Sequence, residues 1–282
     1  MLHPALAGWR RRLRWRRSRW LRGRPHDPLS LAALLVGVAP ARLLAAACPD
    51  LPAMAQWWVA TPWHGQTVRD RVRLLPWPRL DWRAADGAAL IARLAPLFDD
   101  LGMRLVAGPE GMLLLGCDRC WQVAPAPWPQ IEEEGLPDRP PPGADGGAWM
   151  RLMTEVEMAL HQDGIPRAGS VPVHGIWLWG AWSPDPAGAA EGAVAPGLTI
   201  AATGGVRADR WLVGRAEEVA GLLPGGRVPR RLLLAGGGRL CFFPGRGRLW
   251  PRRDPLGEGG GIGGEEELLG MAARPGSRGG FD

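Results

Sequence analysis

Two histidines flank the most strongly patterned stretch of the sequence. His161 ends a predicted helix and His174 begins the apolar run that follows it, with Arg167 in the connection between them. Imidazole and guanidinium groups donate hydrogen bonds to anions, and polar groups at the ends of apolar elements often line one binding site. Together with Glu155 from the helix and Trp179 from the apolar run, these residues form the candidate ligand-binding site.

No catalytic or metal-binding signature is complete. Cys117 and Cys120 have the C-x-x-C spacing of zinc sites, but no second pair of ligands accompanies them. Pro125 and Pro127 follow where a thiol-redox motif would start a helix. The glycine-rich stretches match neither the phosphate loop, which needs a lysine that the chain lacks, nor the dinucleotide motif. We therefore predict no catalytic residue, no metal and no cofactor.

Helical periodicity predicts the element that carries His161. Apolar residues recur at spacings of three and four over 147–161, which indicates an amphipathic helix. Glycines at 164 and 169 mark the turn after it, and the short apolar run 174–179 suits a buried strand. The residues predicted to face the core are Trp149, Leu152, Met153, Val156 and Leu160.

The remaining segments alternate between strand and helix patterns, which predicts an α/β fold. We expect a single mixed-sheet domain with flanking helices over 26–253, followed by a Gly-rich disordered tail over 254–282. Asp86 is the predicted N-cap of one helix and Gly102 its end. The other predicted elements are one or two short helices over 29–47 interrupted at Pro40, strands 56–60, 69–75 and 198–202, helices 86–101 and 216–223, hairpins 104–115 and 232–243, and a surface loop 124–147.

The positive charge belongs to one end of the chain. All 34 basic residues are arginine, and nine of them lie in residues 1–24, which hold no acidic residue. The rest of the chain is slightly acidic, so a nucleic-acid-binding surface on the folded body is not indicated. We predict that residues 1–25 are a basic arm, either disordered or an amphipathic helix that could lie on a membrane surface.

Cysteine usage and hydropathy favour the cytoplasm. Four cysteines are too few to form a disulfide scaffold in a chain of 282 residues. The Arg-rich start and the run from Leu29 to Ala39 copy part of a secretory signal, but Pro40 and Arg42 interrupt the apolar run. No stretch approaches the roughly 20 apolar residues that a membrane-spanning helix needs. We therefore predict a cytoplasmic protein.

The helix and strand motifs resemble those of the RpfE-type regulatory protein family of bacteria. The likeness is carried by WMRLMTEVEMALH at 149–161 and PVHGIWLWG at 172–180, with weaker agreement over roughly 50–215. That family is often labelled phosphoglycerate mutase because its motif is similar to the archaeal-type, cofactor-independent mutases. The resemblance implies a regulatory role and kinship to the alkaline-phosphatase-like superfamily, to which those mutases belong.

The chain departs from the family at positions where chemistry would be expected. His174 replaces the family's asparagine, Gly175 replaces its serine, and the turn before the strand is shorter, which leaves Arg167 as a counterpart. Neither the Asp-Gly-x-Gly-Asp start nor the Gly-Asp-His end of the two-metal mutases is found. The resemblance therefore implies shared ancestry without inherited catalysis.

These observations lead to three functional hypotheses. The first is a non-catalytic cytoplasmic regulatory or ligand-sensing protein of RpfE type, which holds a small anionic ligand or a regulatory partner protein at residues 149–182. The second is a divergent phosphoglycerate-mutase-like phosphotransferase with a cluster of Asp and His around an accessible Ser. The third is a membrane-surface or nucleic-acid-associated protein that binds through residues 1–24.

Overall fold

In the computed structural model, the chain forms two compact units. One unit comprises Val38–Ala202, and the other comprises Met1–Gly37 together with Thr203–Asp282. This division differs from the single domain over 26–253 that the sequence suggests, and the candidate site lies within the first unit. The residues that the structure describes are 19–22, 28–68, 71–76, 80–165, 167, 171–184, 198–200, 206–208, 211–214, 232–236, 239–243 and 262–263.

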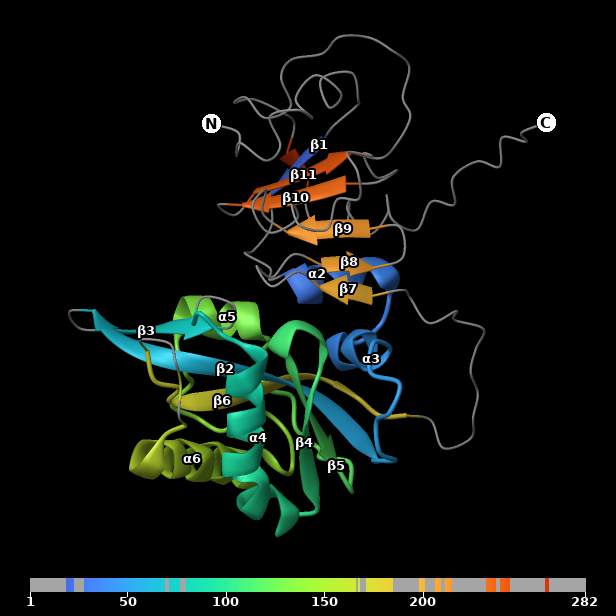
Figure 1. The fold of residues 1–282 in the computed structure, drawn as a ribbon. Coiled ribbons are helices and arrows are strands. Elements are labelled where there is room, and N and C mark those ends of the chain that lie inside the picture. Colours follow the sequence, from blue (N-terminus) through green and yellow to red (C-terminus); the bar gives the residue numbers. More distant parts are fainter. Residues whose placement is uncertain are drawn as a thin grey trace, which may run out of the picture. The chain divides into compact units, whose positions relative to one another are not determined.

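The unit Val38–Ala202 contains a five-stranded sheet with helices packed against it (Figure 1). Four strands follow the order β3-β2-β5-β4, β6 pairs with β2, and every pairing is antiparallel. The mixture of helix and strand agrees with the predicted α/β class, whereas this sheet is antiparallel and not mixed. The elements of the unit are α3 (Pro40–Ala45), β2 (Gln56–Val68), β3 (Arg71–Pro76), α4 (Ala84–Asp99), β4 (Met103–Ala107), η2 (Pro109–Gly111), β5 (Leu113–Cys117), α5 (Trp128–Glu134), α6 (Gly146–Asp163), β6 (Gly175–Trp182) and β7 (Leu198–Ile200).

The other unit is described by one helix and six strands. Its strands are neighbours in the order β12-β1-β11-β10-β9-β8, with parallel pairing of β1 with β12 and of β9 with β10. The predicted hairpin over 232–243 is confirmed by the antiparallel pairing of β10 with β11. These elements are β1 (Arg19–Arg22), α2 (Pro28–Val36), β8 (Val206–Ala208), β9 (Trp211–Gly214), β10 (Leu232–Gly236), β11 (Arg239–Phe243) and β12 (Ile262–Gly263).

Strand β2 is the centre of the five-stranded sheet. Its residues 56–60 pair with β5, residues 63–68 pair with β3, and residues 57–63 pair with β6. Thr61 and Pro62 fall between the β5-paired and β3-paired stretches, so they pair with β6 alone. Because proline has no backbone N–H to donate, a gap in the ladder is where a strand tolerates it.

Helices α4 and α6 lie together on the near side of this sheet in Figure 1 and pack on β4 and β6. Arg93 of α4 donates a hydrogen bond to the carbonyl of Ala159 in α6 (2.7 Å), which ties the two helices near the end of α6. The predicted apolar face of α6 is confirmed. All five of its members are buried, namely Trp149, Leu152, Met153, Val156 and Leu160.

Tryptophan dominates the core of this unit. The rings of Trp149 from α6 and Trp177 from β6 meet edge to face, with 4.7 Å between their centroids, an arrangement that stabilises aromatic pairs beyond simple burial. The indole N–H of Trp179 donates to Thr61 Oγ1 across the β2–β6 pair (2.8 Å). The strand predicted at 174–179 is thus a buried core strand, and it continues to Trp182.

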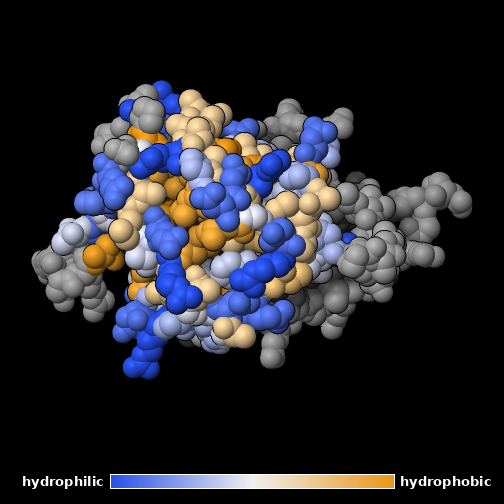
Figure 2. Space-filling view, turned by 90° about the horizontal axis from the view of Figure 1, so that it is seen from below, coloured by the Kyte–Doolittle hydropathy of each residue, from blue (hydrophilic) through white to orange (hydrophobic). Residues whose placement is uncertain are grey.

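The surface of the described residues carries few large apolar side chains. Figure 2 shows one face, on which apolar side chains lie in gaps between hydrophilic ones. No helix among the described residues is long and apolar enough to cross a membrane. The exposed large apolar residues are Val72, Leu101, Leu136 and Met158.

Some sequence-based boundaries were wrong. The strand predicted to stop at residue 60 runs to Val68. Asp86 is not the N-cap of α4, because the helix begins at Ala84 and the carboxylate instead accepts the backbone N–H of Arg83 (2.9 Å). The predicted loop 124–147 contains α5. The predicted helix 216–223 lies outside the described residues, as do the arm and the tail apart from β1 and β12.

Candidate functional site

The candidate site lies where β2 and β6 leave their paired stretch. Their pairing ends at Trp63 and Gly175, and the next residue along β2 and the one before β6 are both histidines, His64 and His174. The two imidazole rings lie with their centroids 4.5 Å apart at a tilt of 39°. The sheet pairing therefore brings together two titratable side chains 110 residues apart in the chain.

Hydrogen bonds determine which nitrogen of each ring carries a proton. Nδ1 of His64 lies 2.9 Å from the carbonyl oxygen of Pro172 and must donate, because a carbonyl can only accept. Nδ1 of His174 accepts the backbone N–H of Gly65 (3.1 Å), so it carries no proton. Neutral His64 therefore presents a lone pair on Nε2, whereas neutral His174 presents an Nε2–H donor.

The surroundings favour the neutral form of His174. Burial lowers the pKa of this half-buried imidazole, and positive charge on His64 and on His161 lowers it further. His161, at the end of α6, is exposed. The charge of His161 thus acts on His174, while no hydrogen bond or ring contact between the two is described.

Trp63 places an indole against the same pair of strands. A Cβ atom at Gly175 would lie 2.6 Å from Cζ2 of Trp63, so only glycine leaves room for this ring. The ring also contacts His174 edge-on, with 6.3 Å between centroids. Its Nε1–H is buried and has no hydrogen-bond partner among the described residues, and a buried donor without a partner is uncommon in folded proteins.

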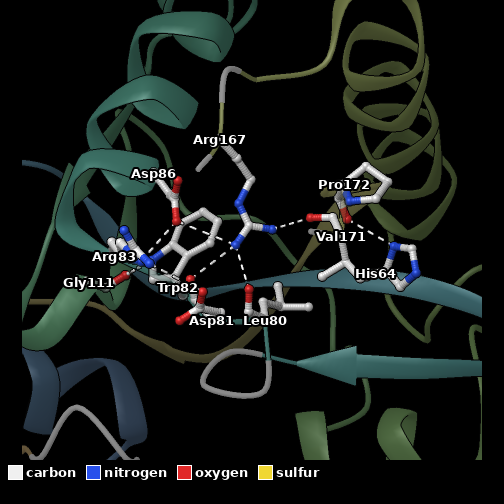
Figure 3. A network of polar contacts seen from close by, with 10 residues as sticks. All are labelled: His64, Leu80, Asp81, Trp82, Arg83, Asp86, Gly111, Arg167, Val171 and Pro172. Carbon is white, nitrogen blue, oxygen red and sulfur yellow. Dashed lines mark hydrogen bonds and ion pairs between the residues drawn. The ribbon is translucent and has the colours of Figure 1, made fainter. Parts of the chain in front are cut away.

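Arg167 holds the connection between α6 and β6 against the rest of the unit (Figure 3). Its guanidinium donates to the carbonyls of Val171 and Leu80 and lies 3.4 Å from Oδ2 of Asp86, with its charge 5.3 Å from the Trp82 ring centre. The Arg167 and Asp86 side chains are only 3% and 5% exposed. In Figure 3 the guanidinium contacts Val171 from one side and the His64 ring contacts Pro172 from the other.

The predicted site residues occupy different environments. His161 acts on His174 through its charge, as described above. The side chains of Arg167 and Trp179 are buried: the Nη atoms of Arg167 and the indole N–H of Trp179 donate to partners inside the unit, whereas Nε of Arg167 has no partner among the described residues. Glu155 is exposed on α6, and no hydrogen bond or ion pair described here joins it to the histidines. The exposed part of the site is therefore formed by histidines.

The C-x-x-C segment is split between two environments. Cys117 is buried at the end of β5, where burial raises the pKa of its thiol to about 12, and Cys120 is exposed beside Ser183 (3.6 Å between Sγ and Oγ). A thiol with a raised pKa is a poor nucleophile and metal ligand. Within the ranges that the structure describes, no group of three or more His, Cys, Asp or Glu could hold a metal ion.

Comparison with known proteins gives no relative. The chain matches no model of a protein family, no curated protein and no solved structure. The resemblance to RpfE-type proteins remains a prediction that depends on the motifs at 149–161 and 172–180.

Sequence reasoning missed His64, Trp63 and the role of the Pro172 carbonyl. All three depend on β2 continuing beyond Pro62, and the rule that proline ends a strand interior concealed this continuation. The available signal was the alternation after Pro62, where Trp63 is buried and His64 and Gln66 face out on the other side of the strand.

Proposed function

We propose that the unit Val38–Ala202 is a non-catalytic regulatory or ligand-sensing module of RpfE type that binds a small anionic ligand in the cytoplasm. The observation that carries this proposal is the stacking of His64 on His174 at the junction of β2 and β6, with His161 of α6 acting on His174 through its charge. Imidazole N–H groups at this junction can donate to an oxyanion, and no carboxylate contributes to the pKa of His174.

The hydrogen bonds that attach the described residues of the α6–β6 connection to the rest of the unit support this proposal. The connection is fastened at Val171 by Arg167, at Pro172 by His64, and at His174 by the carbonyl of Trp63 (2.9 Å). A side chain held by several bonds loses little conformational entropy when it binds a ligand. The motif that suggests the family thus also builds the framework of the proposed site.

The alternative function is a divergent phosphoglycerate-mutase-like phosphotransferase related to the alkaline-phosphatase-like superfamily. Such chemistry requires Asp and His ligands for two metals around an accessible Ser. Binding of a regulatory partner protein to the same junction, and binding of membranes or nucleic acid through residues 1–24, are further alternatives that the tests below separate.

Calorimetric titration of the purified full-length protein with inorganic phosphate at pH 6.5 tests the proposal. We expect saturable binding that weakens severalfold in His161→Gln, because the variant removes an imidazole donor and one hydrogen bond contributes about 0.5–1.5 kcal/mol. Arg151→Gln is the matched control, since it removes an exposed charge from the same helix about 15 Å along its axis. Phosphate binding that is absent, or equally weakened in both variants, would overturn the anion-site proposal.

An activity assay separates regulation from catalysis. The same preparation with Mn²⁺ is supplied with 3-phosphoglycerate, and formation of 2-phosphoglycerate is followed by coupling to enolase. We expect no conversion above the rate without protein. Conversion, together with tight binding of two Mn²⁺ per chain, would establish the phosphotransferase alternative. Pelleting with anionic vesicles or DNA that is lost when residues 1–24 are deleted would instead support a function for the arm.

A further inference from the structure

Protonation would affect the hydrogen bonds of the two stacked histidines, His64 and His174, differently. Protonating His64 adds an N–H at its exposed Nε2 and leaves its bond to Pro172 intact, because Nδ1 already donates. Protonating His174 places a hydrogen on Nδ1, directly against the N–H of Gly65. A proton on His64 therefore costs no hydrogen bond, whereas a proton on His174 breaks the bond from Gly65.

Neighbouring groups reinforce this difference. Around the ring of His174, positive charge comes from His64 on β2 and His161 on α6, and both lower its pKa. Leu75, which pairs with His64 from β3, carries no charge. On the connection that precedes β6, the Arg167 guanidinium is bonded to the carbonyl of Val171, one residue before Pro172. A second proton on the pair would thus meet the positive charge of the first and that of His161, while the Arg167 charge is paired with Asp86.

One proton on His64 gives the stacked pair two Nε2–H donors, one on each ring. The ring centroids lie 4.5 Å apart at a tilt of 39°, which keeps both rings within reach of one oxyanion. The buried Trp63 indole, beside Gly175, adds a neutral donor without a described partner close to the same pair. Without that proton, Nε2 of His64 presents a lone pair, which repels an anion.

We propose that His64 is the proton-dependent donor of the site, so that binding of a tetrahedral oxyanion of the sulfate or phosphate class is accompanied by protonation of His64. This inference rests on the proposed anion-binding function and assigns to it an additional residue and a dependence on pH. The site then senses an oxyanion and acidity together, and it holds its ligand more tightly as the pH falls toward 6.

Sulfate is the probe that isolates the protein's own titration, because its charge does not change between pH 6 and pH 8. Because only the protonated His64 ring adds its Nε2–H to that of His174, we expect the association constant for sulfate to rise severalfold from pH 8 to pH 6. Calorimetry at pH 7 in two buffers of different ionisation enthalpy should show net uptake of protons as sulfate binds.

Two variants test whether His64 is the group that takes up the proton when sulfate binds. In His64→Gln we expect sulfate binding to be weaker at pH 6 than in the wild type and to depend less on pH. Gln66→Ala, an exposed change two residues along the same strand, should keep the wild-type pH dependence. Near-ultraviolet circular dichroism of the buried tryptophans verifies that each protein is folded at both pH values.

The outcomes separate this inference from the proposed function. Sulfate binding that does not change with pH, or an unaltered pH dependence in His64→Gln, overturns the role of His64 and leaves the anion site standing. No sulfate or phosphate binding at any pH overturns both. Repeating the titration with 3-phosphoglycerate distinguishes the source of the oxyanion. A higher affinity for 3-phosphoglycerate than for the free ion at both pH values would show that the ligand is a phosphorylated metabolite, and an equal affinity would show that it is the free ion.

Discussion

The guanidinium of Arg167 and the carboxylate of Asp86 form a buried ion pair, with 3.4 Å between Nη2 and Oδ2. The pair joins the connection after α6 to the first turn of α4, where Asp86 also accepts the N–H of Arg83. A buried ion pair contributes little over apolar residues of the same shape, but removing one partner leaves the other charge uncompensated. The pair therefore fixes the position of the connection after α6. Removing either partner alone should lower the free energy of unfolding strongly.

Arg167→Met should lower the free energy of unfolding by about 3–5 kcal/mol, because it strands the Asp86 charge and releases the Val171 and Leu80 carbonyls. Adding Asp86→Asn should recover part of this loss, since the amide is neutral and its oxygen can still accept from Arg83. Urea denaturation followed by tryptophan fluorescence measures both. A single variant as stable as the wild type, or a double variant no better than the single, would contradict this account.

Gly175 is required by the ring of Trp63. A methyl group at this position would lie 2.6 Å from the ring, so Gly175→Ala should lower the free energy of unfolding by about 1–3 kcal/mol through overpacking. Gly147→Ala is the control, because no atom lies within 4 Å of its Cβ position and alanine favours the helix by about 0.5–1 kcal/mol. Equal effects of the two substitutions in urea denaturation would remove the steric explanation.

Local periodicity predicted what is decided locally. The apolar spacing over 147–161 predicted α6 and its buried face, because a helix of this kind is stabilised by one apolar stripe facing the core. The strand at 174–179 was predicted from a short apolar run between turn residues. The end of α4 was predicted from Gly102, whose φ of +65° is accessible to glycine without strain.

The features that the sequence did not predict depend on contacts between segments that are distant in the chain. Nothing near Pro62 indicates that β6 will pair with it, and it is the pairing with β3 over residues 63–68 that carries β2 past His64. Likewise, the sequence predicted Arg167 as a ligand-binding residue, whereas its guanidinium donates to the carbonyl of Leu80, 87 residues away. Residue types suggested histidines near one junction, but the stacking of His64 on His174 follows from sheet register, which the sequence does not state.

The hydrogen bond from Trp179 to Thr61 should contribute measurably to stability because both residues are buried. Thr61→Val keeps the shape of the side chain and leaves the indole N–H unpaired, which costs about 1–3 kcal/mol. Thr154→Val on α6 makes the same substitution at an exposed position and should change the free energy of unfolding by less than about 0.5 kcal/mol. Thermal or urea unfolding compares the two, and losses of the same size would contradict the role of the bond.

Acid should destabilise the junction through His174. Its pKa is lowered in the folded protein, so the unfolded chain binds the proton more tightly, and the stabilising contribution of the neutral ring is lost as the pH falls below the ordinary histidine value of about 6.5. We expect the free energy of unfolding to decrease from pH 7.5 to pH 5.

His174→Gln should flatten this dependence, since an amide oxygen can accept the Gly65 N–H at every pH. In His64→Gln the free energy of unfolding should decrease less over the same pH interval than in the wild type, because this variant removes a positive charge that lowers the pKa of His174. Urea denaturation at each pH measures the three proteins. Parallel curves for wild type and His174→Gln would show that another group carries the acid sensitivity.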